Sequence, residues 1–129
     1  MVVHAGVAYV SGQLPRRGDE LVRGRVGEDV ALEAAQAAAG LCAVAVLAVL
    51  RQALGELAQV ERCLQLSGFV NAAPDFTRHS EVMNGASALV ADAFGEAGTH
   101  TRAAVGVASL PFGVPVEVSA VFAIRGPAV

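Results

Sequence analysis

The chain has 129 residues and a mass of 13.1 kDa; 54% of its residues are hydrophobic, 16% are charged, and the formal net charge is -3. This is the length of one domain over residues 1–129, long enough to bury roughly two thirds of the unfolded surface. All nine basic residues are arginine, which excludes lysine Schiff-base chemistry, and no basic run favours a nucleic-acid partner. High hydrophobicity with so few charges predicts an apolar subunit interface.

Neither a membrane span nor a signal segment is expected. The longest run without a polar side chain, Ala37–Leu50, has fourteen residues, whereas a bilayer span needs roughly 20. Met1–His4 lacks the basic flank and apolar stretch of a signal peptide. A cytoplasmic protein is therefore expected. Cys42 and Cys63 lack metal-ligand spacing and stand in apolar contexts, so we expect buried free thiols and no metal site.

The first half of the chain predicts two strands and a long helix. Residues 7–13 are β-branched and aromatic at their start and predict a strand that enters a loop. A glycine-bearing turn at 16–19 leads to a short partner strand at 20–23, in a hairpin. The apolar segment 30–54 predicts a helix that Asp29 caps and the following glycine ends.

The next segment predicts a central strand and a second helix. Residues 60–71 alternate imperfectly between apolar and polar, which favours a strand with a bulge or a close approach at Gly68. Pro74 and Asp75 fit the start of a helix, with Asp75 as its cap, and the helix is expected to end at Phe94.

Two short strands complete the pattern, at 105–109 and 116–124. The segment between them, 110–115, contains two prolines and a glycine and must form a loop. The predicted order is β-β-α-β-α-β-β. It indicates an α+β fold, a mixed sheet with two helices on one face.

Six separated motifs then agree on one family. They are Val10-Ser11-Gly12-Gln13-Leu14-Pro15, Ser67-Gly68-Phe69-Val70-Asn71, Pro74-Asp75-Phe76, Val82-Met83-Asn84-Gly85-Ala86-Ser87, His100-Thr101-Arg102-Ala103-Ala104-Val105-Gly106-Val107, and Leu110-Pro111 with Val116-Glu117-Val118. In this order they resemble the Rid family, also called the YjgF or endoribonuclease L-PSP-like family. The resemblance covers residues 7–125.

The resemblance implies a chorismate-mutase-like fold that assembles as a homotrimer, with the sheets inside, the helices outside and ligand clefts between subunits. Well-known members hydrolyse reactive enamines and imines such as 2-aminoacrylate to a 2-keto acid and ammonia, without a cofactor or metal. This chain is therefore expected to be a hydrolase whose partner is a small enamine or imine carboxylate.

The same resemblance implies two catalytic residues. Arg102 matches the arginine that holds the substrate carboxylate, and a planar guanidinium suits that task because it donates two parallel hydrogen bonds. Without the motif, Arg102 reads as a surface or ion-paired arginine. Glu117 matches the glutamate that orients or activates water; the alternative is an outward-facing strand residue or an interface salt bridge.

Four further residues match substrate-binding positions. Ser11 fits a serine near the cleft, or a hydroxyl that satisfies backbone at a strand end. Asn84 fits an asparagine that reaches the cleft, or one that bonds the neighbouring subunit's backbone. Ala104 replaces a common cysteine whose backbone the family uses. Phe112 either lines the cleft rim or, as the favoured reading, is a packed loop aromatic.

The geometry of the catalytic pair is left open by the sequence. If the loop at 110–115 closes a tight hairpin, Glu117 lies opposite Ala108, roughly 20 Å along the strand from Arg102. The two would then meet only across a subunit boundary or through a looser register. No histidine has a serine or cysteine partner that the sequence reveals, so a nucleophilic triad is not predicted.

Two rival functions remain at this stage. A non-catalytic trimer could bind a small carboxylate metabolite through Arg102. RNA cleavage, which the family's older name implies, ranks last because the sequence offers no basic groove, no aromatic platform and no histidine pair for acid–base chemistry.

Overall fold

A computed structural model describes residues 1–126, which form one five-stranded sheet with the strand order β1-β2-β7-β5-β6. The strands are β1 (Val2–His4), β2 (Val7–Gln13), β5 (Val60–Asn71), β6 (Thr101–Val107) and β7 (Val116–Ile124). Strands β5 and β6 are parallel and the other neighbours are antiparallel.

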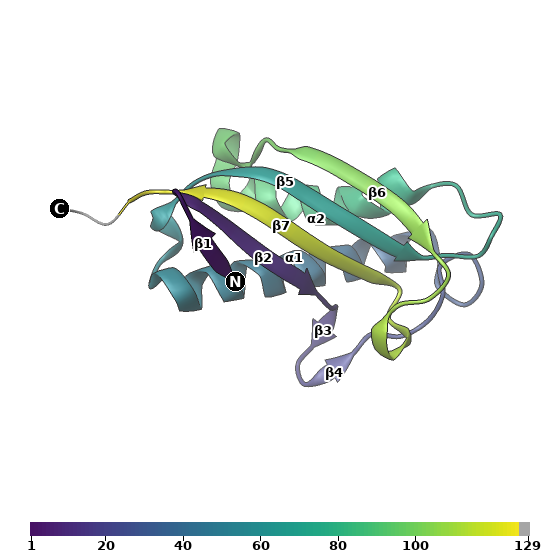
Figure 1. Cartoon of the computed structure of the whole chain (residues 1–129). Helices are drawn as coiled ribbons and strands as arrows, with labels where there is room; N and C mark the ends of the chain where they lie inside the picture. Colours follow the sequence, from purple (N-terminus) through teal and green to yellow (C-terminus); the bar gives the residue numbers. More distant parts are fainter. Residues whose placement is uncertain (127–129) are drawn as a thin grey trace.

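Two helices, α1 (Leu32–Leu54) and α2 (His79–Phe94), cover one face of this sheet and lie behind it in Figure 1. Within residues 1–126 no element covers the opposite face. Short helical turns, η1 (Leu57–Gln59), η2 (Gly95–Gly98) and η3 (Pro111–Gly113), join the main elements. The α+β class, the mixed sheet and the placement of both helices are as predicted.

The core follows from alternation along the strands and from small residues on α1. Along β7, Val116, Val118 and Phe122 are fully buried against the helices, while the residues between them point to the uncovered face. On α1 the buried side is largely alanine, which lets α2 approach closely. A Cβ added at Gly85 would lie 2.0 Å from the backbone oxygen of Gln36, so the two helices meet where Gly85 has no side chain.

Several boundaries differ from the sequence predictions. Strand β1 was not expected. The hairpin joins β3 (Arg16–Arg17) to β4 (Glu20–Leu21) as a separate two-stranded sheet, because the chain leaves the main sheet after β2. Strand β6 begins four residues earlier than predicted and ends at Val107.

The predicted helix caps are wrong. The Asp29 carboxylate accepts a hydrogen bond from the backbone N–H of Arg25 at 2.7 Å, inside the preceding loop, and Ala31 takes the N-cap position of α1. Asp75 lies in a turn, and α2 begins only at His79 after Arg78. Gly68 is a close approach to Met83 of α2; the register shifts of β5 lie earlier in the strand.

Helix α1 is long and apolar enough to cross a bilayer by length and composition: an 18-residue window within it has a mean hydropathy of 1.9. The apolar run counted from the sequence held only the fourteen residues that lack any polar side chain. One third of the 18-residue window is buried, and the buried side packs against β7, β2 and α2. This packing is that of a core helix in a folded domain.

Both cysteines are buried and free, as predicted. Burial, together with the nearby Glu117 charge, raises the pKa of Cys42 to about 12, and burial raises that of Cys63 to about 11. Neither thiol is a nucleophile at neutral pH. No cluster of three metal-ligating side chains occurs in residues 1–126.

Candidate functional site

The Arg102 side chain lies at the sheet edge, where strand β6 packs beside helix α2. Its Nη1 donates to Asn84 Oδ1 at 2.9 Å and to Ser87 Oγ at 3.1 Å, and its Nη2 donates to the backbone oxygen of Ser80 at 3.1 Å. All three acceptors are neutral. Three of the five guanidinium N–H groups are thus engaged, and within residues 1–126 the other two have no partner.

The next question is what surrounds the Arg102 side chain. It is exposed, and within residues 1–126 it belongs to no ion pair. Asn84 holds the guanidinium in place. Ala104 follows two residues later on the half-buried side of the same edge strand. We call Arg102, Asn84, Ala104, Ser87 and His100 the arginine half-site.

The Glu117 side chain lies on the uncovered face of the sheet. Glu117 alternates with buried residues of β7 and is itself only half-buried. A Cβ added at Gly12 would lie 2.3 Å from Glu117 Oε2, so the carboxylate rests against the bare backbone of β2. Ser11 precedes Gly12 in a stretch where the pairing of β2 with β7 shifts register. We call Glu117, Gly12 and Ser11 the glutamate half-site.

The two half-sites do not meet within one chain. Strands β6 and β7 form no hairpin, because β5 lies between them. Glu117 pairs with Phe69, and Phe69 pairs with Val105, so Glu117 is level with Val105 and not with Ala108. Arg102 is only about 10 Å further along the strand direction, but its side chain is on the helix-covered face and Glu117 is on the other.

Phe112 lies apart from both half-sites, in the turn η3. Its side chain is 70% exposed, so the reading as a packed loop aromatic is wrong. Its φ of 59° is in the left-handed region, and its carbonyl accepts a hydrogen bond from Arg23 Nε at 3.1 Å. It borders a hollow of about 520 Å³ lined by Arg16, Asp19, Glu20, Leu21, Arg23 and Phe112.

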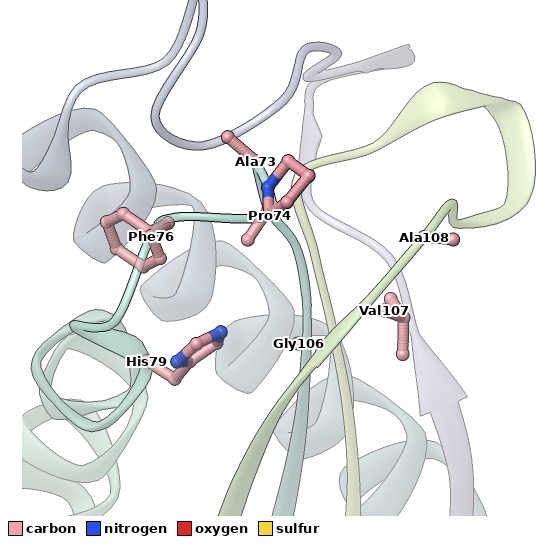
Figure 2. A pocket seen from close by; sticks show the side chains of 8 residues that line it. Ala73, Pro74, Phe76, His79, Gly106, Val107 and Ala108 are labelled. Carbon is pink, nitrogen blue, oxygen red and sulfur yellow. The ribbon is translucent and has the colours of Figure 1, made fainter.

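Another hollow, of about 390 Å³, lies between the start of α2 and the end of β6. Figure 2 shows Phe76 and His79 on one side and the chain from Gly106 to Ala108, at the end of β6, on the other. The rings of Phe76 and His79 meet edge to face, with centroids 5.3 Å apart. His79 covers Gly106, where an added Cβ would lie 2.5 Å from its Nε2.

The structure also brings together a serine and a histidine that the sequence did not connect. Ser87 Oγ is 2.8 Å from His100 Nε2, and His100 Nδ1 is 2.5 Å from the backbone oxygen of Gly98. Both residues lie in the quoted motifs, but 13 positions separate them. Only the packing of α2 beside β6 reveals the pair.

Comparisons with known proteins agree with this architecture. The family described as "YjgF/chorismate_mutase-like, putative endoribonuclease" matches residues 2–123. The chain belongs to this family, the YjgF or Rid family. The fold is accordingly chorismate-mutase-like.

Individual relatives cover most of this Rid protein. It is 47% identical over 114 residues to protein TCP17 of Trypanosoma cruzi, covering 87% of this chain and 71% of that one. It is 47% identical to Atu1372 of Agrobacterium tumefaciens, a protein of unknown function, with a TM-score of 0.94 over 96% of this chain and 79% of that one. E. coli TdcF, solved with bound serine, has 22% identity and a TM-score of 0.65, covering 97% and 85% of the two chains, and shows the shared fold.

Proposed function

We propose that this Rid protein is a hydrolytic deaminase of small enamine or imine carboxylates of the 2-aminoacrylate kind, which releases a 2-keto acid and ammonia. The observation that carries the proposal is how the Arg102 guanidinium is hydrogen-bonded. Three neutral acceptors hold its guanidinium at an exposed edge, and two N–H donors remain for a ligand. A permanently charged, pre-oriented fork is suited to a carboxylate.

The other residues take their roles around that carboxylate. The backbone at Ala104 and the side chain of Asn84 border the ligand, and Glu117 of a neighbouring copy places water against the imine carbon. Ser11 of that copy orients the nitrogen end, and Phe112 closes the rim. Fixed positions of this kind lower the barrier because they convert a bimolecular attack into an intramolecular one. No cofactor or metal takes part.

A homotrimer is proposed because a single chain separates the two half-sites. The uncovered sheet face supports this: Val2, Tyr9 and Val105 on it are 64%, 48% and 48% exposed, an apolar surface that a second copy can bury. Packing of these faces would leave the helices outside and clefts between subunits. A cytoplasmic trimer of about 39 kDa, three times 13.1 kDa, is the expected species.

One specific observation favours a second candidate, a non-catalytic trimer that binds a small carboxylate. The arginine half-site is assembled within one chain, whereas the water-placing Glu117 is not beside it. E. coli TdcF, which carries bound serine, supports an amino-acid-like ligand for either candidate. RNA cleavage ranks below both, because the sequence has no run of basic residues interleaved with aromatic residues that would bind and stack a nucleic acid.

The test measures 2-keto acid release from 2-aminoacrylate generated in situ. We expect Arg102→Ala to lower kcat/KM by about 100-fold or more, because two charge-assisted hydrogen bonds are lost. Arg102→Lys is the matched control, since it keeps the charge but lacks the planar fork, and it should recover only part of the loss. Equal rates for wild type and Arg102→Ala would refute the deaminase. Arg102-dependent carboxylate binding without turnover would favour the second candidate.

A further inference from the structure

The arginine half-site contains a chain of hydrogen bonds with a fixed direction. A carbonyl oxygen only accepts, so the contact between His100 Nδ1 and Gly98 places the ring proton on Nδ1. The Nε2 lone pair then accepts the hydroxyl proton of Ser87 at 2.8 Å. Ser87 Oγ in turn accepts from Arg102 Nη1 at 3.1 Å. His100 is thereby connected through the Ser87 hydroxyl to the Arg102 guanidinium.

The hydrogen-bonded residues His100, Ser87 and Arg102 border a hollow that can hold a ligand. Ser87 and His100 are half-buried, and they border a hollow of about 320 Å³ lined by Ser87, Ala91, Gly98, Thr99, His100 and Arg102. In a 2-imino acid the reacting carbon is bonded directly to the carboxylate carbon. A 2-imino acid in this hollow, which Arg102, Ser87 and His100 all border, therefore lies against the guanidinium and the Ser87 hydroxyl together.

Charged neighbours of His100 come from β6, β5 and η2. Arg102 lies on β6, and Arg62 of β5 lines a second hollow with His100 and donates to the backbone oxygen of Thr99 at 3.0 Å. Glu96 of η2 and Glu61 of β5 line the adjacent hollow with Arg62. The α2 side contributes the uncharged Ser87 and Ala91. Arg102 keeps its proton at working pH, so His100 is the group of this network that can exchange one.

We propose that Ser87 and His100 form a proton relay that serves the imine bound at Arg102. The relay rests on the proposed deaminase function and names the groups that move protons in it. As water attacks, its oxygen forms a bond to the iminium carbon and the π pair moves to nitrogen. The water proton passes to Ser87 Oγ while the Ser87 proton passes to His100 Nε2, which gives a neutral carbinolamine and an imidazolium.

The same relay then works in reverse. His100 returns its proton through Ser87 to the amine, the C–N bond breaks with its electron pair on nitrogen, and the hydroxyl oxygen forms the keto group. The hydroxyl proton is taken up by the departing ammonia, so an iminium and water give a ketone and ammonium. Glu117 of the neighbouring copy orients the water, and Ser87 and His100 transfer its proton.

Kinetics of 2-aminoacrylate hydrolysis test the relay. Ser87→Ala and His100→Gln should each lower kcat about 100-fold with KM within about threefold, because general acid–base groups contribute 10²- to 10⁴-fold. A pH dependence of kcat that comes from the relay should vanish in His100→Gln. Ser87→Thr keeps the hydroxyl and should stay within about tenfold of wild type.

The outcomes separate the relay from the deaminase. Arg102-dependent turnover with an unchanged kcat and pH profile in His100→Gln would overturn the relay alone. A rise in KM at constant kcat in Ser87→Ala would also overturn it, since Ser87 would then only position Arg102. No turnover by wild type would overturn the deaminase and the relay with it. Nitrogen-15 NMR of wild type should find neutral His100 protonated on Nδ1, and a proton on Nε2 would contradict the relay.

Discussion

The arginine and glutamate half-sites are built in opposite ways. Arg102 is held by side-chain and backbone acceptors of one helix, so its geometry is complete within a single chain. Glu117 rests over a bare glycine on a sheet face that nothing in residues 1–126 covers. The comparison teaches that one half is set by the packing of α2 on β6, whereas the other depends on what meets the open face.

The largest expected effect is the loss of the trimer when the uncovered sheet face is altered. Val105→Glu places a carboxylate on the apolar surface that we propose to be shared by subunits, and burying an unpaired charge is costly. We expect the trimer to give way to folded monomers of about 13 kDa with no deaminase activity, measured by light scattering and ketoacid release. Val44→Glu is the matched control, because Val44 is 49% exposed on α1 and Val105 is 48% exposed. A trimeric Val105→Glu protein would contradict the proposed interface.

Next in size is a substitution that disturbs the arginine half-site through packing. Gly85→Ala adds a methyl group 2.0 Å from the backbone oxygen of Gln36, which cannot move without separating α1 from α2. We expect a loss of about 3 kcal/mol in the free energy of unfolding, by urea denaturation. Gly126→Ala, with open space around it, should stay within about 0.5 kcal/mol. Equal stability of the two variants would mean that the helices tolerate more separation than their contact indicates.

The same substitution in the glutamate half-site should act on activity instead. Gly12→Ala meets the flexible end of Glu117, which can swing away. We expect kcat to fall about tenfold while the free energy of unfolding changes by less than about 1 kcal/mol. Steady-state kinetics and urea denaturation on one preparation give both numbers. Unchanged kcat would indicate that the observed position of Glu117 has no bearing on the reaction.

A pH dependence beneath the glutamate half-site has no effect near neutral pH and appears only in alkaline solution. The folded pKa of Cys42 is about 12 against an ordinary value of 9.0, so the unfolded thiol loses its proton first as pH rises. Stability from this group is therefore complete below about pH 9 and falls between pH 9 and 12, by about 1.4 kcal/mol per pH unit. Urea denaturation of wild type and Cys42→Ala should show a steeper decline for wild type. Parallel curves would contradict this assignment.

Much of the fold could be predicted from local patterns. The alternation of apolar residues in 60–71 predicted the bounds of β5, and glycines marked where α1 and α2 end. Strand pairing could not be predicted, because the insertion of β5 between β6 and β7 depends on contacts between distant segments. The caps failed for a local reason: Asp29 found a backbone partner within its own loop.

The candidate site divides in the same way. Arg102 and Glu117 could be selected from motifs, but their assignment to opposite sheet faces required the register of three strands. The Ser87 and His100 pair could not be foreseen, because the two motifs that contain them meet only after α2 packs beside β6. Local sequence predicted the residue types, and tertiary packing determined which of them act together.

The measurement that tests the account most directly uses mixed trimers. Arg102→Ala and Glu117→Gln chains carrying different tags are co-expressed, and trimers that contain both are isolated. If each cleft takes Arg102 from one subunit and Glu117 from its neighbour, every mixed trimer has one intact cleft of three, and about one third of wild-type activity should return. If one chain supplies both residues to a cleft, mixed trimers will be as inactive as either variant alone, and the account is contradicted.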